Sequence, residues 1–116
     1  MIIIAGTIEF EDEKHRDTAL EQSRPLQQAT RDDEPGCLAY CFAADPCVPN
    51  RIQVYELWKD EPSLMAHFTH HTYLEMVEVL NSVGIRETEN QMYLIDKHKS
   101  VYDEDGNPRT VLFGDE

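Results

Sequence analysis

Apolar and polar residues alternate with a period of two in four stretches of the chain, which is the pattern of β-strands. The clearest stretch is residues 52–59. One face carries Ile52, Val54, Glu56 and Trp58, and the other carries Gln53, Tyr55, Leu57 and Lys59. Residues 2–10, 37–44 and 87–97 follow the same alternation less strictly, and the first two are apolar on both faces. We therefore predict four strands, at residues 2–10, 37–44, 52–59 and 87–97.

Two further stretches repeat their apolar positions every three or four residues, which predicts helices. The first covers about residues 13–31, with Asp12 as its N-cap and a kink at Pro25. The second begins near residue 61 after Asp60, and Gly84 ends it. A capping box at residues 72–75 predicts that this second helix is bent or starts afresh at Thr72.

The order of these elements is β-α-β-β-α-β, which is typical of the ferredoxin-like α+β fold with an antiparallel sheet. Two helices cover only one face of such a sheet, yet the first three strands carry apolar residues on both faces. A second copy of the same sheet would bury the remaining face. We therefore predict a homodimer in which two sheets form a dimeric α/β barrel.

The chain divides into a domain at residues 1–99 and an extension at residues 100–116. The extension contains a turn at residues 103–108 between short apolar stretches, of which residues 111–113 are consecutive. A polar tail of this length would be disordered, whereas these apolar residues favour an ordered segment. We expect a terminal hairpin, or an arm that packs on the partner subunit.

Charge and composition exclude several classes of function. The formal charge is −13, with 23 acidic and 10 basic residues, so the chain would be repelled by nucleic acid and by anionic membranes. No apolar run approaches the roughly 20 residues that span a bilayer. Three cysteines, an odd number, suit a reducing compartment. We expect a cytoplasmic protein with no nucleic-acid or membrane partner.

Three motifs occur in a specific order: Glu34-Pro-Gly-Cys-Leu-Ala-Tyr40, Val54-Tyr-Glu-Leu-Trp-Lys-Asp60 and Leu64-Met-Ala-His67. Together they resemble the antibiotic biosynthesis monooxygenase (ABM) family, and the resemblance covers about residues 1–96. It implies a dimeric α+β barrel with a pocket between helices and sheet. Characterised members oxygenate phenols and hydroquinones without metal or flavin, so the expected partners are a small aromatic molecule and O2, with no cofactor.

The resemblance implies that His67, Glu56 and Trp58 occupy motif positions of the site. Removal of a phenolic proton needs a base, and an imidazole titrates near neutral pH. We expect His67 to be this base and His71, four residues later, to assist it. Glu56 would orient a histidine. The expected substrate-binding residues are Trp58, Tyr55, Phe68 and Tyr73.

Each of these residues also has a simpler explanation. Trp58 fits a core aromatic, Glu56 a salt bridge, and His70 and His71 fit a polar helix break. The group His67, His70, His71 and Glu75 has the spacing of a metal site, although the sequence fixes no third ligand and we predict no metal. Two other functions stay open: a non-catalytic small-molecule-binding or stress-response dimer, and an isomerase of a small hydroxyketone.

Overall fold

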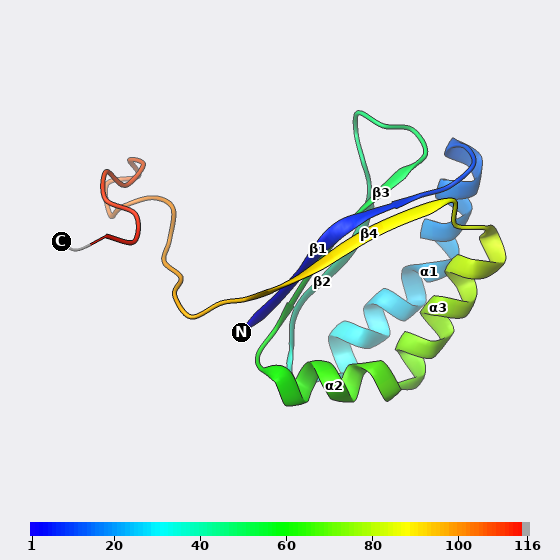
Figure 1. Cartoon of the computed structure of the whole chain (residues 1–116), viewed down its shortest axis with the longest axis horizontal. Coiled ribbons are helices and arrows are strands. Elements are labelled where there is room, and N and C mark those ends of the chain that lie inside the picture. Colours follow the sequence, from blue (N-terminus) through cyan, green and yellow to red (C-terminus); the bar gives the residue numbers. More distant parts are fainter. Residues whose placement is uncertain (115–116) are drawn as a thin grey trace.

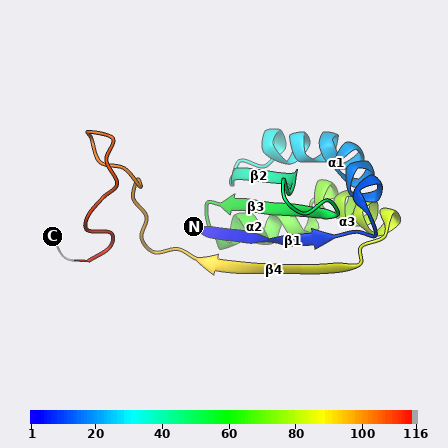
Figure 2. The same cartoon turned by 90° about the horizontal axis from the view of Figure 1, so that it is seen from above.

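The structure is a computed structural model that describes residues 1–114. Its elements, in chain order, are β1 (Ile2–Glu9), α1 (Glu13–Asp33), β2 (Cys37–Ala44), β3 (Arg51–Trp58), α2 (Glu61–Thr69), α3 (His71–Val83) and β4 (Glu87–Leu94). The strands pair antiparallel in the order β2-β3-β1-β4. All three helices lie on one face of this sheet (Figures 1 and 2). The predicted ferredoxin-like α+β fold is confirmed.

The predicted helix ends are confirmed at three positions. Asp12 and Asp60 accept hydrogen bonds from the first turns of α1 and α2, and Gly84 ends α3 in the left-handed conformation with a φ of 103°. The start of α3 differs from the prediction, because the cap is His70 rather than Thr72. The His70 ring accepts a hydrogen bond from Thr72 N.

Strand β3 follows the predicted alternation. Its helix-facing residues are all buried: Ile52, Val54, Glu56 and Trp58. Strand β2 departs from the predicted alternation at its start, where the register with β3 shifts between Cys37 and Ala39. The extra residue, Leu38, is thereby 52% exposed instead of sharing a face with the buried Tyr40. A β-bulge of this kind leaves one residue unpaired and reverses the side-chain directions before it.

Side chains of α1 cover the free edge of β2. Gln27 Nε2 donates to Phe42 O at 3.2 Å, and Phe42 N donates to Gln27 Oε1 at 2.9 Å. Arg31 Nε donates to Tyr40 O at 2.7 Å. The amide of Gln27 therefore pairs with the edge as a neighbouring strand would, which protects β2 from pairing with another chain.

Strand β4 forms the other edge, and all its residues are exposed. The sheet face opposite the helices is uncovered in the single chain and carries apolar and aromatic groups, including Tyr55 and Tyr93. No helix among the described residues is long and apolar enough to cross a membrane.

Residues beyond β4 extend away from the rest of the domain (Figures 1 and 2). Ile95 N still donates to Met1 O at 2.9 Å. Farther along, Tyr102 and Pro108 form an isolated bridge, and Asp103 N donates to Asn107 O at 2.9 Å. The arm, residues 96–114, thus contains an ordered turn. The predicted extension ended at Glu116, and its last two residues lie outside the described part.

Candidate active site

A cavity of about 410 Å³ lies between the helix-facing side of the sheet and helices α2 and α3. Its walls are mainly apolar and come from every strand and from both of these helices. Four titratable side chains take part in the lining: Tyr40, Glu56, His67 and Tyr73. Met92 of β4 also lines the cavity and is 66% exposed, so the cavity opens towards this edge. A mainly apolar cavity with a few polar groups is the usual form of a small-molecule site.

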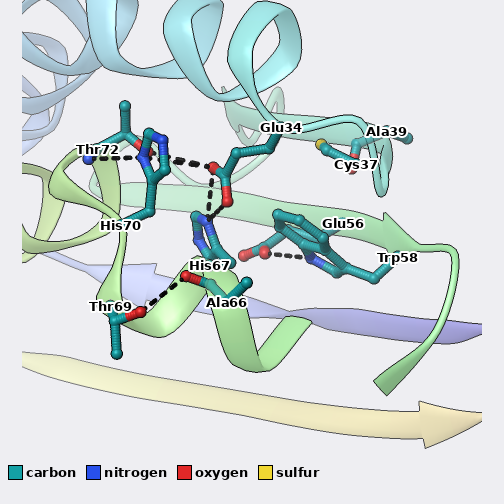
Figure 3. A network of polar contacts seen from close by, with 10 residues as sticks. All are labelled: Glu34, Cys37, Ala39, Glu56, Trp58, Ala66, His67, Thr69, His70 and Thr72. Carbon is teal, nitrogen blue, oxygen red and sulfur yellow. Dashed lines mark hydrogen bonds and ion pairs between the residues drawn. The ribbon is translucent and has the colours of Figure 1, made fainter. Parts of the chain in front are cut away.

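His67 is held in the cavity wall by a carboxylate that follows α1. The His67 ring is buried, and its Nδ1 lies 2.9 Å from Glu34 Oε2 and 3.1 Å from Glu34 Oε1 (Figure 3). Glu34 is itself buried and accepts a further hydrogen bond from Thr72 Oγ1 at 3.2 Å. A carboxylate facing Nδ1 favours the tautomer in which Nδ1 carries the proton.

This tautomer leaves His67 Nε2 with a free lone pair. No buried side-chain nitrogen or oxygen among residues 1–114 lacks a hydrogen-bond partner. The hydrogen bonds of His67 are made at Nδ1, so Nε2 has no hydrogen-bond partner among these residues. Nε2 is therefore not an enclosed atom, and it reaches the open space of the cavity that His67 lines. Burial lowers the pKa of His67, and the Glu34 hydrogen bond partly offsets this effect. The ring is therefore neutral at pH 7, as a proton acceptor must be.

The two helices that form this wall meet at His70. His70 N donates to His67 O at 3.0 Å at the end of α2, and the His70 ring caps α3 through Thr72 N at 3.2 Å. Thr72 in turn reaches Glu34. The turn between α2 and α3 thus positions the carboxylate that holds His67 (Figure 3).

Glu56 is a second buried carboxyl group in the cavity wall. Trp58 Nε1 donates to Glu56 Oε1 at 2.9 Å, so the buried indole lies beside the carboxyl rather than in the cavity lining (Figure 3). Burial raises the pKa of Glu56 to about 7, the Trp58 hydrogen bond opposes this shift, and the charge of Glu34 adds to it. Both protonation states of Glu56 are therefore populated near neutral pH.

Aromatic rings surround His67. The ring centroid of Trp58 lies 4.5 Å from that of His67, Tyr73 lies at 5.3 Å and Tyr40 at 5.7 Å. Phe68 follows at 6.1 Å and packs on Tyr73 in an edge-to-face arrangement. These rings exclude water from one side of the imidazole and give the cavity flat apolar walls.

The structure brings some of the predicted site residues together and separates others. His67, Glu56, Phe68 and Tyr73 line one cavity, with Trp58 behind Glu56. Tyr55 lies on the opposite face of β3 and is 44% exposed. His71 is exposed on α3, where its Nδ1 lies 2.8 Å from Glu75 Oε2.

Two predicted roles therefore lack the geometry they require. Glu56 bonds Trp58 rather than a histidine, and Glu34 takes the orienting position. The break at His70 places His71 in a new helix, so the spacing of four residues no longer puts it beside His67. Within residues 1–114, no three or more His, Cys, Asp or Glu side chains are grouped so that they could hold a metal ion.

Sequence reasoning did not assign Glu34 to the site, although this residue belongs to a motif that it singled out. Glu34 precedes a Pro-Gly turn, and its hydrogen-bond partner His67 is 33 residues away along the chain. A carboxylate in a turn is ordinarily solvated, so residue type alone gave no reason to bury it. The feature that could have identified Glu34 from the sequence was its position at the start of the 34–40 motif.

Solved structures with the same arrangement support the fold. A protein of the antibiotic biosynthesis monooxygenase type from Deinococcus radiodurans superposes with a TM-score of 0.77 and 20% identity, covering 89% of this chain and 100% of that one. SnoaB, a cofactor-independent oxygenase from Streptomyces nogalater, superposes with a TM-score of 0.62 and 8% identity, covering 84% and 94%. At these identities the likeness concerns the fold alone.

Sequence comparison adds a relative and a family. An uncharacterised protein of Synechocystis sp. is 28% identical over 94 residues, which are 81% of this chain and 63% of that protein. The chain therefore spans less than two-thirds of that relative. The sequence model described as antibiotic biosynthesis monooxygenase matches residues 1–79, which include His67, Glu34 and Glu56. The chain belongs to the antibiotic biosynthesis monooxygenase family.

Proposed function

We propose that this protein is a cofactor-independent monooxygenase that oxidises a small phenol or hydroquinone with O2. The observation that carries the proposal is the state of His67: a buried, neutral imidazole whose Nδ1 is held by Glu34 and whose Nε2 faces an apolar cavity. Family membership supports the reaction class, and a cofactor-independent oxygenase shares the fold.

In the proposed reaction His67 Nε2 accepts the phenolic proton. Glu34 stabilises the imidazolium that forms, because its carboxylate already lies 2.9 Å from Nδ1. The electron-rich phenolate passes one electron to O2, and the resulting radical pair combines at a ring carbon. His67 returns its proton to the peroxide that forms, and loss of water from this hydroperoxide, in which the ring carbon loses its hydrogen, leaves a quinone. One phenol and one O2 thus give one quinone and one water.

The walls of the cavity suit an aromatic substrate. A volume of about 410 Å³ falls within the range of small-molecule sites, and Phe68 and Tyr73 offer ring faces and edges. The same apolar walls keep bulk water from the phenolate, so that charge developing near His67 is felt strongly. The proposed pocket residues are accordingly Phe68, Tyr73 and Tyr40, with Trp58 as the support of Glu56.

Oxygen uptake tests the proposal. Purified, metal-analysed protein is mixed with a panel of naphthols and hydroquinones, and uptake is compared with autoxidation in buffer. We expect uptake that falls by at least about 100-fold in His67→Ala, since a positioned base contributes 10²–10⁴-fold, and that persists in the exposed control His71→Ala. Equal uptake in His67→Ala would contradict the role of His67. Uptake no faster than autoxidation across the panel would favour a binding protein or an isomerase.

We also propose that the working unit is a homodimer and that the arm packs on the partner subunit. The uncovered face of the sheet carries Tyr55 and Tyr93, while the arm exposes apolar side chains such as Leu112 and Phe113. Both features are typical of surfaces that are buried by association. Light scattering should give twice the chain mass of 13.4 kDa, and removal of residues 97–116 should weaken the dimer. A monomer at micromolar concentration would contradict this proposal.

A further inference from the structure

Glu56 has one oxygen that the protein does not use. Its Oε1 accepts the Trp58 indole hydrogen, and its second oxygen takes part in no hydrogen bond of the described residues. None of the buried side-chain oxygens in that part of the chain is unpaired, so this second oxygen borders the cavity that Glu56 lines. A side chain only 6% exposed therefore presents a polar atom to whatever fills the cavity.

The neighbours of Glu56 provide no cation for it. Titratable groups face it from several elements: Glu34 after α1, Cys37 and Tyr40 of β2, His67 of α2 and Tyr73 of α3. Burial keeps His67 neutral and holds the pKa of Tyr40 above its usual value. Glu34 is acidic and disfavours a second negative charge. A carboxyl group in such surroundings is readily protonated, and a protonated carboxyl donates a hydrogen bond.

We propose that Glu56 donates a hydrogen bond to an oxygen of the bound molecule, so that the pocket selects a planar phenol that also carries a carbonyl-type acceptor oxygen. The phenolic hydroxyl would lie at His67 Nε2, on the helix side, and the acceptor oxygen at Glu56, on the sheet side. The inference deepens the proposed function, because it concerns the same pocket. It is a statement about binding, however, and can be tested without turnover.

Trp58 provides a direct readout of Glu56. It is the only tryptophan in the chain, and its indole nitrogen is bonded to the carboxyl in question. Ionisation of Glu56 should therefore change tryptophan fluorescence, with a midpoint near pH 7. We expect this transition to disappear in Glu56→Gln, whose amide does not titrate, and to remain in the exposed control Glu75→Gln. A transition that survives in Glu56→Gln would overturn the assignment.

Ligand selection is measured with two probes of nearly equal shape, 4-hydroxyacetophenone and 4-ethylphenol. Only the first carries a carbonyl acceptor oxygen. A third probe, 3-hydroxyacetophenone, places that carbonyl at a different position on the ring. At pH 5.5 we expect calorimetry to give about tenfold tighter binding of a ketone than of 4-ethylphenol, the effect of one good hydrogen bond. The preference for 3-hydroxyacetophenone over 4-ethylphenol, whose hydroxyls both stay mainly protonated at pH 8.5, should vanish at that pH in the natural protein. It should persist at both pH values in Glu56→Gln, whose amide still donates.

Glu56→Leu removes the donor and should abolish the preference at both pH values. The melting temperature of Glu56→Leu shows whether this variant folds. If it does not fold, the test is whether Glu56→Gln keeps its preference for a ketone at both pH values. Equal binding of all three phenols by the natural protein at pH 5.5, or no binding of any, would overturn the proposed selection. A preference without oxygen uptake would uphold this inference and contradict the monooxygenase instead.

Discussion

The two edge strands of the sheet differ in how they are supported. Strand β2 is tied to α1 through Gln27 and Arg31 and begins shortly after Glu34, the carboxylate that holds His67. Strand β4 pairs only with β1, is exposed along its whole length, and leads into the arm. One side of the molecule thus fixes the reactive group, while the other side leaves the cavity open at Met92.

This difference indicates that the two sides of the molecule have different roles. A base must be held within a narrow geometry, and the β2 side provides buried, fully hydrogen-bonded partners for that purpose. Entry of a ligand requires an opening, and the β4 side provides it. Substitutions on the β2 side should therefore affect stability and chemistry together, whereas most substitutions on the side of β4 that faces away from the cavity should leave the chemistry unchanged.

The largest effect should come from removing the carboxylate on the β2 side. Glu34→Ala leaves His67 Nδ1 buried without its partner and removes one of the two hydrogen bonds of Thr72 Oγ1, which together cost about 3 kcal/mol. Urea unfolding measures this loss, with the exposed neighbour Asp33→Ala as control. Oxygen uptake should also fall, because the imidazolium loses its partner. If Glu34→Ala and Asp33→Ala had equal unfolding free energies, the β2 side would not hold the site as described.

One position on the β4 side should be an exception. A Cβ at Gly6 in β1 would lie 2.7 Å from the Asn90 Cα and closer still to the Glu89 carbonyl oxygen of β4. Gly6→Ala therefore forces β4 away from β1, and we expect a loss of about 2–3 kcal/mol, as in other overpacked sites. Thermal unfolding of Gly6→Ala and of the exposed Glu89→Ala tests this. Similar stability of the two variants would mean that β4 shifts freely.

The third effect depends on pH. The folded-state pKa of Glu56 is raised from 4.5 to about 7, so folding favours its protonated form. Its contribution to stability is complete below pH 4.5 and is lost as the pH rises through 7, by about 3 kcal/mol. Glu56→Gln should remove this dependence, so the difference in unfolding free energy between the two proteins should grow between pH 5 and pH 8. A constant difference would contradict the raised pKa.

The smallest effect should come from the cover of the β2 edge. Gln27→Ala removes two hydrogen bonds to Phe42 and should cost about 1 kcal/mol. Hydrogen exchange at Phe42 N should become faster, since this amide then faces solvent. The exposed neighbour Gln28→Ala should change neither quantity, and unchanged exchange in Gln27→Ala would show that another group protects the edge.

The local pattern of apolar residues and capping residues predicted the fold well, because a few neighbouring residues are enough to indicate each helix or strand. The alternation of 52–59 fixed which side chains of β3 are buried, and Asp12, Asp60 and Gly84 marked helix ends. Local pattern failed where a single residue interrupts it. The bulge at Leu38 and the cap at His70 each shift the phase of the neighbouring residues, and neither residue type is specific for such a role.

The site was less accessible from the sequence because its key contact joins distant segments. His67 was singled out, but its partner lies in a turn 33 residues earlier, and only the packing of elements distant in the chain brings the two together. The assignment of His71 relied on a spacing of four residues within one helix, although a bend or a fresh start at Thr72 was also predicted, and the break at His70 removes that spacing. Tyr55 followed the alternation correctly, and that same alternation directs it away from the cavity.

The joint at His70 has a consequence for how this chain can diverge. The residue ends the helix that carries the proposed base and begins the helix that supplies most of one cavity wall. Mutations at Met76 or Val77, one turn or more into α3, would reshape that wall while leaving His67 and Glu34 untouched. Descendants of such a protein could therefore exchange one aromatic substrate for another by drift in a single helix, with the proton-transfer chemistry inherited intact.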